Sequence, residues 1–138
     1  MADKLSPERR SRNMAAIRSK NTKPEMIVRS MVHGLGFRYR LHRKDLPGKP
    51  DLVFGPRRKV IFVHGCFWHL HPDPDCKDAR IPQSRRDYWL PKLTRNTERD
   101  RDHVQQLEAM GWQVLIIWEC EVRRPDELRE RLRDFLSR

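Results

Sequence analysis

The spacing of hydrophobic residues along the chain predicts three amphipathic helices. Apolar positions follow a helical period over residues 22–35, which begin with a Thr-x-x-Glu capping box that ends at Glu25. A second helix is expected over residues 84–110, and a third begins at Pro125. Residues 1–20 contain few apolar side chains, and only a short helix is predicted there.

Four shorter apolar segments have the composition of strands. Residues 37–41, 51–54, 59–64 and 112–118 are rich in β-branched and aromatic side chains, and turn residues follow the first two. The segment 59–64 is apolar at every position between its two ends, which is typical of a central strand. The order helix-helix-strand-strand-strand-helix-strand-helix predicts an α/β fold with a mixed central sheet flanked by helices.

The charge of the chain indicates a polyanionic partner. The 138 residues are enough for one domain, and 30 Lys and Arg against 19 Asp and Glu give a net charge of +11. Residues 1–50 alone carry 13 basic and 4 acidic side chains, a net charge of +9. We therefore interpret residues 1–20 as a basic arm that contacts this partner.

Nothing in the sequence resembles a targeting or membrane-spanning segment. The first residues, MADKLSPERR, lack the apolar stretch of a secretory signal, and no apolar run approaches the ~20 residues that span a bilayer. These features exclude a membrane protein and predict a cytoplasmic location. The three cysteines cannot all pair, which in a cytosolic chain favours metal binding or free thiols.

The cysteines and one histidine are spaced as ligands of a structural metal. Cys66 and Cys76 enclose His71, while Cys66 and Cys120 each lie just past the end of a predicted strand. Because a strand-helix-strand unit is normally parallel, both strand ends meet at one edge of the sheet. Three thiolates and one imidazole suit tetrahedral zinc, although buried cysteines can also be simple hydrophobic residues. The rival fourth ligands are His69, Asp73 and Asp75.

Asp51 is a candidate metal ligand of a different kind. It begins a predicted strand after a turn, and the next strand ends in Phe-Val-His64. Mg²⁺ requires hard oxygen ligands, and many metal-dependent nucleases hold it with a carboxylate on one strand of a hairpin. The second strand offers no carboxylate and no lysine at this point, so Val63 could contribute only its backbone carbonyl. A solvent-facing Asp51 is an equal alternative from the residues alone.

Other candidate residues lie in and beside the long connection 65–84. His69 could transfer a proton near neutral pH, with a plain loop histidine or a zinc ligand as the alternative. Glu25 is explained by the capping box, a role compatible with one in catalysis. Aromatic residues in a basic protein can stack on bases or wedge between them. We favour this for Phe67 and Trp68, and we expect core packing for Trp112 and Trp118; Tyr88 and Trp89 lie beside the connection.

Four motifs and part of the arm resemble the very-short-patch repair (Vsr) family of DNA mismatch endonucleases. They are Pro-Gly-Lys-Pro-Asp51, Val-Ile-Phe-Val-His-Gly-Cys-Phe-Trp-His69, Arg-Asn-Thr-Glu-Arg-Asp100 and Gly-Trp-Gln-Val-Leu-Ile-Ile-Trp-Glu-Cys120, with Arg-Ser-Arg-Asn-Met-Ala-Ala-Ile17 in the arm. The resemblance covers nearly the whole chain, and HGCFWH is highly specific. It implies a restriction-endonuclease-like fold, with residues 1–20 as a DNA-binding arm and residues 21–138 as a single nuclease domain.

The resemblance also implies a reaction and the residues that carry it out. The family nicks one strand of double-stranded DNA on the 5′ side of the thymine in a T·G mismatch, which arises when 5-methylcytosine is deaminated. Asp51 would ligate catalytic Mg²⁺, with a main-chain contribution from Val63, and His69 would act as general base for the attacking water. Glu25 and His64 match supporting positions of the active site.

Further positions match family residues that bind structural metal or DNA. The structural Zn²⁺ ligands would be Cys66, His71, Cys76 and Cys120. Phe67, Trp68 and Trp89 match aromatic residues that enter DNA from the major-groove side. Met14 matches a residue of the arm that approaches from the minor groove.

This chain departs from the family at two places. The stretch between His71 and Tyr88 differs in length and is more acidic and richer in proline, and position 63, which can carry a hydroxyl in the family, is Val63 here. We expect a monomeric enzyme that acts on double-stranded DNA. The alternatives are a zinc-stabilised DNA-binding module without catalysis and a restriction-type endonuclease that cuts both strands, which would need a dimer.

Overall fold

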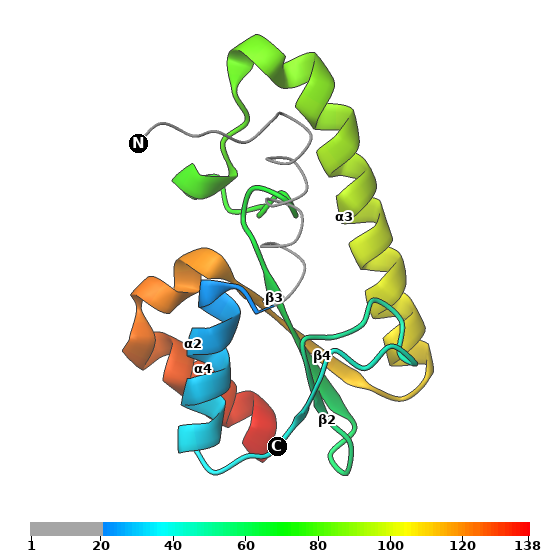
Figure 1. Ribbon diagram of the computed structural model, residues 1–138, viewed down its shortest axis with the longest axis vertical. Coiled ribbons are helices and arrows are strands. Elements are labelled where there is room, and N and C mark those ends of the chain that lie inside the picture. The colour runs from blue at the N-terminus through cyan, green and yellow to red at the C-terminus, as the bar shows by residue number, and fades with distance from the viewer. Residues whose placement is uncertain (1–20) are drawn as a thin grey trace, which may run out of the picture.

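The structure is a computed structural model that describes residues 21–138 (Figure 1). The arm predicted for residues 1–20, with its short helix and Met14, lies outside the described residues. Within residues 21–138 no helix is both long and apolar enough to cross a membrane. In chain order the helices and strands are α2 (Lys23–Gly34), β1 (Arg40–Leu41), β2 (Leu52–Phe54), β3 (Lys59–His64), α3 (Arg86–Ala109), β4 (Gln113–Trp118) and α4 (Pro125–Ser137).

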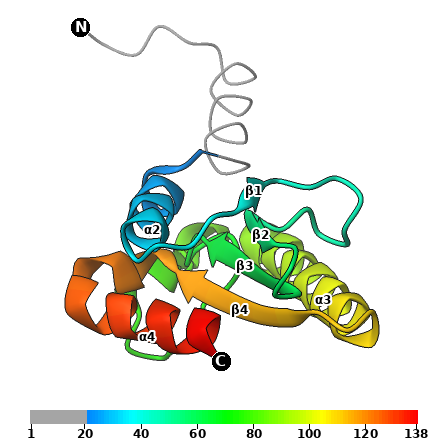
Figure 2. The same cartoon turned by 90° about the horizontal axis from the view of Figure 1, so that it is seen from below.

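The four strands form one mixed sheet in the order β1-β2-β3-β4 (Figure 2). β1 pairs antiparallel with β2, and β2 with β3, whereas β3 and β4 are parallel and are connected through α3. The register places His64 opposite Trp118, so β3 and β4 end at the same edge of the sheet. The mixed sheet flanked by helices that the sequence predicts is confirmed.

The helices cover both faces of the sheet and create two hydrophobic cores (Figure 1). α2 and α4 pack on one face, and α3 packs on the other. Alternation along β3 divides its side chains between them: Ile61 belongs to the core with α2 and α4, while Val60 and Phe62 belong to the core with α3. The residues between Lys59 and His64 are all apolar because β3 is covered on both faces.

Two elements depart most from the ranges that the sequence predicts. Only Arg40–Leu41 of the segment 37–41 pairs as a strand. The N–H of Phe37 donates instead to the carbonyl of Val32 (3.3 Å) at the end of α2, and the ring packs against the core. The long helix begins at Arg86 rather than at residue 84, because Gln83–Arg85 form a separate 3-10 turn.

Candidate functional site

Asp51 lies directly before β2, and its side chain is held against β3. Its Oδ2 atom accepts a hydrogen bond of 2.7 Å from the backbone N–H of Val63. The pKa of Asp51 is raised to about 7, mainly by burial and also by the Glu25 carboxylate, against the opposing effect of the Val63 N–H. The side chain is only 14% exposed, so the solvent-facing alternative for Asp51 is wrong.

Glu25, in the first turn of α2, reaches the same place from another element. One of its carboxylate oxygens accepts a hydrogen bond from the N–H of Asn21 (2.9 Å), and the other lies 2.9 Å from His42 Nε2 and 3.5 Å from the Arg29 guanidinium. His42 Nε2 is also 3.8 Å from Asp51 Oδ1. Sequence reasoning missed His42, because a single histidine after a strand carries no pattern. Half of the predicted capping box forms, since the Glu25 N–H donates to the hydroxyl of the N-cap residue Thr22 at 3.3 Å, while the Glu25 carboxylate accepts from Asn21.

His69 is paired with a carboxylate on α3. Its Nδ1 atom lies 2.5 Å from Asp100 Oδ2, and the ring of His64 stacks on its ring with centroids 3.9 Å apart. Burial lowers the pKa of His64 to about 3, so this imidazole stays neutral. The buried Nδ1 atom of His64 has no hydrogen-bond partner among the described residues. Asp100 lies in a recognised motif but received no role, because a polar position on a helix reveals no long-range partner.

Asp51 and His69 line one pocket, although they come from different segments. The pocket has a volume of about 450 Å³ and lies between the turn before β2, the end of β3 and the face of α3. Asp100 and the cations Lys49 and Arg99 also line it. The arrangement therefore combines a metal-binding type of carboxylate, a histidine oriented by a carboxylate, and positive charge.

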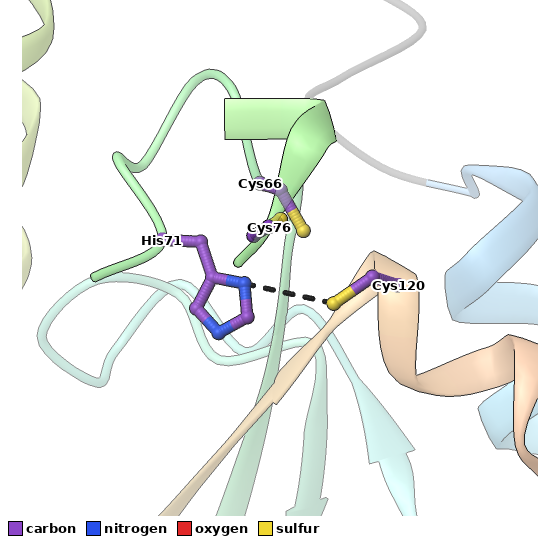
Figure 3. A group of neighbouring side chains, drawn as sticks. All are labelled: Cys66, His71, Cys76 and Cys120. Carbon is purple, nitrogen blue, oxygen red and sulfur yellow. Dashed lines mark hydrogen bonds between the residues drawn. The ribbon is translucent and has the colours of Figure 1, made fainter. Parts of the chain in front are cut away.

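The four predicted zinc ligands converge beyond the ends of β3 and β4 (Figure 3). One ligand atom from each lies within 4.8 Å of the ligand atoms of the other three, and the four are Cys66, His71, Cys76 and Cys120. The Sγ of Cys120 is 3.6 Å from Nδ1 of His71, whose ring stacks on Trp118 at 4.3 Å. Glu119 accepts a hydrogen bond of 2.9 Å from the backbone N–H of Cys66. Three thiolates and one imidazole at this spacing fit a closed tetrahedral zinc site.

The rival zinc ligands lie outside this group. His69 is turned to the carboxylate of α3, and Asp73 and Asp75 hydrogen-bond within a neighbouring turn, where the Asp75 N–H donates to Asp73 Oδ1 at 2.9 Å. Leu70 adopts a φ of 48°, in the left-handed region that residues with a side chain rarely occupy. This conformation separates two neighbouring histidines, since His69 faces the pocket and His71 faces the cysteines.

Three of the predicted DNA-binding aromatic residues form a cluster where the connection 65–84 meets α3. The ring centroid of Phe67 lies 5.1 Å from the centroids of Trp68 and Trp89, and the centroids of the two tryptophans are 5.7 Å apart. Each of the three ring pairs meets edge to face. The Asn96 side chain donates a hydrogen bond of 3.0 Å to the carbonyl of Trp68. Because Trp68 directly precedes His69, the cluster adjoins the pocket. Tyr88, beside Trp89, is 49% exposed.

The two tryptophans of the last strand region differ from each other. Trp112 is buried in the core with α3, as predicted. Trp118 does not lie in either core, so the prediction for it is wrong. It is half-buried at the end of β4, where its ring contacts the rings of His71 and His64. The last residue of the strand is covered by the connection 65–84 instead of by a helix.

Comparison with known proteins places these features in a family. Residues 2–77 match the family described as DNA mismatch endonuclease Vsr. The chain is 53% identical over 137 residues to the Type II nicking enzyme V.XorIIP of Xanthomonas oryzae pv. oryzae, covering 99% of this chain and 98% of that protein. The chain belongs to the Vsr family. This Vsr-family endonuclease is also 42% identical over 130 residues to the DNA mismatch endonuclease Vsr of Escherichia coli, covering 94% of this chain and 81% of that protein.

A solved structure gives independent support for the fold of the Vsr-family chain. It is similar to the catalytic domain of the homing endonuclease I-Bth0305I, with a TM-score of 0.57, over 85% of this chain and 96% of that chain. The sequence identity is 17%, so this likeness concerns the fold alone. The predicted restriction-endonuclease-like fold class is confirmed.

Proposed function

We propose that this Vsr-family enzyme nicks one strand of double-stranded DNA on the 5′ side of the thymine in a T·G mismatch, with Mg²⁺ held at Asp51. The observation that carries the proposal is one pocket that contains a carboxylate suited to Mg²⁺ and a histidine suited to proton transfer. The names of relatives, a mismatch endonuclease and a nicking enzyme, support this choice of reaction. The net charge of +11 supports DNA as the partner.

Asp51 would hold Mg²⁺ together with the backbone carbonyl of Val63. A residue in a strand directs its N–H and C=O toward the same neighbouring strand, and the Val63 N–H already contacts Asp51. Because this ligand would be a backbone atom, the absence of a side-chain hydroxyl at position 63 would not affect binding of the ion. Glu25 offers a second carboxylate close by. The chemistry that Mg²⁺ supplies when bound is neutralisation of charge on the scissile phosphate and acidification of a water molecule.

His69 would remove the proton from the attacking water. Because a carboxylate only accepts hydrogen bonds, Asp100 fixes the proton of His69 on Nδ1 and leaves the Nε2 lone pair available. The same carboxylate stabilises the imidazolium that forms after proton transfer. The stacked, neutral His64 holds the plane of the His69 ring without adding a competing charge.

Zn²⁺ bound by Cys66, His71, Cys76 and Cys120 would have a structural role, because four protein ligands leave no open position for a substrate. It would tie the connection 65–84 to the end of β4. Phe67 and Trp68 follow the first ligand directly, and His69 comes next. The closed site would therefore hold the aromatic residues and the general base in fixed positions.

We assign recognition of the mismatch to the aromatic cluster of Phe67, Trp68 and Trp89. Inserting such a wedge costs a few kcal/mol of unstacking per step, and least at a mismatch, so weak stacking itself contributes to selectivity. Insertion of Trp68 would also bring the DNA backbone to His69. The arm, residues 1–20 with Met14, would add contacts to phosphates and the minor groove. Because a single active site hydrolyses a single strand, a monomer would be sufficient for nicking.

The proposal is tested by incubating the enzyme and Mg²⁺ with labelled duplexes, either matched or carrying one T·G mismatch, on denaturing and native gels. We expect a broken strand only on the denaturing gel, only in the mismatched duplex and only 5′ of the thymine. Asp51→Asn is the inactive control, and His33→Ala, at an exposed position of α2, is the active control. Cleavage of both strands, or binding without cleavage, would overturn the proposal in favour of one of the two alternatives.

A further inference from the structure

His42 lies between two carboxylates that belong to different elements. Its Nε2 atom is 2.9 Å from Glu25 Oε2 and 3.8 Å from Asp51 Oδ1. One ligand atom from each of the three residues lies within 4.8 Å of the other two. Glu25 comes from the first turn of α2, His42 directly follows β1, and Asp51 directly precedes β2. The fold thus gathers two carboxylates and one imidazole at a single point.

The backbone of His42 holds its side chain in this position. Its φ of 47° lies in the left-handed region, which is uncommon for a residue with a side chain and tends to occur at functional sites. Its N–H donates a hydrogen bond of 3.3 Å to the backbone carbonyl of Asp51. The imidazole is therefore positioned by a backbone that is tied to the candidate metal ligand.

A simpler role for His42 would be to satisfy the buried carboxylate of Glu25. Glu25 already has other partners, because Asn21 donates to Oε1 at 2.9 Å and the Arg29 guanidinium lies 3.5 Å from Oε2. That role also does not account for the proximity of His42 to Asp51. Two carboxylate oxygens and an imidazole nitrogen converging in this way form a mixed donor set for a divalent cation.

We propose that His42, together with Asp51 and Glu25, is a ligand of the catalytic cation, and that its nitrogen makes the site bind Mn²⁺ more tightly than Mg²⁺. The proposal rests on the proposed function, in which Asp51 holds that cation. Mg²⁺ prefers hard oxygen ligands and keeps its water molecules, whereas first-row transition ions accept imidazole readily. His42 would then set the metal preference of this enzyme.

The test measures Mn²⁺ binding to the zinc-loaded protein by electron paramagnetic resonance, with Mg²⁺ as the competitor. We compare the wild type with His42→Ala, His42→Gln and the exposed control His33→Ala. The expected result is a Mn²⁺ affinity that falls about tenfold or more in both His42 variants, with Mg²⁺ affinity changed by less than about threefold. Coupling of bound Mn²⁺ to an imidazole nitrogen should appear in the wild type and in His33→Ala and be absent from both His42 variants.

Two results would overturn the assignment of His42. Equal weakening of both ions in His42→Ala, with recovery in His42→Gln, would show that His42 only holds Glu25 in place, because glutamine keeps a donor for Glu25. Nitrogen coupling that persists in the His42 variants and disappears in His69→Ala would identify His69 as the nitrogen ligand. Nicking of the T·G duplex with Mg²⁺ is measured in parallel on the wild type. Its absence would count against the proposed function, while the Mn²⁺ data would still decide the role of His42.

Discussion

The two candidate metal sites lie near the same edge of the sheet, but one is built mainly from sulfur ligands and the other mainly from carboxylate oxygens. The cluster of Cys66, His71, Cys76 and Cys120 offers soft sulfur ligands and one imidazole, and the protein itself fills all four positions. The site at Asp51 offers carboxylate oxygens and the imidazole of His42, beside a pocket of about 450 Å³. A metal site whose positions are all filled by the protein is suited to stabilising the fold, whereas an oxygen-rich site beside a pocket is suited to chemistry on a phosphate. The difference predicts that changes in the first affect stability and changes in the second affect rate.

The two sites are nevertheless joined through a short piece of backbone. His69 faces the pocket beside Asp51 and His71 faces the cysteines, and the left-handed Leu70 between them directs the two side chains apart. Holding the cysteines in place would therefore also hold the proposed general base, His69. Each substitution below either separates the two roles or shows that they cannot be separated.

The largest effect on rate is expected from Asp51→Asn. Nicking should fall to background, because the principal oxygen ligand of the cation is lost. The melting temperature at about pH 8 should be unchanged or higher, since a carboxylate whose pKa is raised to about 7 by burial is disfavoured in the folded protein once it is ionised. Gel assays and thermal melting check both parts. Near-normal cleavage at saturating Mg²⁺ would remove Asp51 from the site.

His69→Ala should lower the single-turnover rate by roughly 10²–10⁴-fold, which is the usual contribution of general acid–base catalysis. Asp100→Asn should give a smaller loss, because it leaves the imidazole in place but removes the carboxylate that fixes its tautomer. Zinc content should not change in either variant. A rate for His69→Ala close to that of the wild type would mean that another group removes the proton.

Cys120→Ser should produce the opposite pattern and act mainly on stability. Loss of one of four ligands should release about one zinc per chain and lower the melting temperature by about 10 °C or more, equivalent to roughly 3 kcal/mol. Metal analysis and thermal melting provide the measurements. Asp73→Asn is the matched control, because Asp73 lies nearby but outside the cluster. Freshly purified wild-type protein without zinc would contradict the interpretation of the closed site.

Trp68→Ala tests a residue that lies in the chain between Cys66 of the cysteine cluster and His69 of the pocket. The nicking rate on T·G duplex should fall far more than the affinity for matched duplex, which rests mostly on phosphate contacts. If Trp68 were only a packing residue, truncation would instead lower stability by about 3–5 kcal/mol. A large drop in melting temperature with unchanged activity per folded molecule would therefore reassign Trp68 to a structural role.

The smallest effect is expected from deletion of residues 1–20, which carry six basic and two acidic side chains. DNA affinity should decrease, and its dependence on salt should become flatter, because fewer counterions are released from phosphates. Both metal sites should keep their ions. Unchanged affinity across a salt series would show that the arm does not contact DNA.

Local patterns were sufficient to predict the fold and the convergence of the cysteine cluster. The apolar run of β3, the helix start at Thr22 and the parallel strand–helix–strand unit are properties of neighbouring residues, and each is found in the structure. The convergence of Cys120 with the connection 65–84 followed from that topology. The roles of Asp51 and His69 are implied by the family resemblance, because their residue types alone leave other roles open.

The residues that were missed depend on contacts between distant segments. His42 meets Glu25 across 17 positions of sequence, and Asp100 meets His69 across 31. Neither His42 nor Asp100 belongs to a periodic pattern or to a motif with fixed spacing from its partner, so no local pattern identifies the contact. Trp118 was assigned to the core from its apolar strand, but its position at the end of β4 places it against the histidines instead.

The most direct test of the division between a closed and an open metal site is anomalous X-ray diffraction from crystals grown with Mn²⁺. We predict one zinc peak among Cys66, His71, Cys76 and Cys120, and one separate manganese peak within ligand distance of Asp51. A zinc peak alone, with no manganese at Asp51, would contradict the catalytic role of the open site. Absence of zinc from the cysteine cluster would contradict the structural role of the closed one.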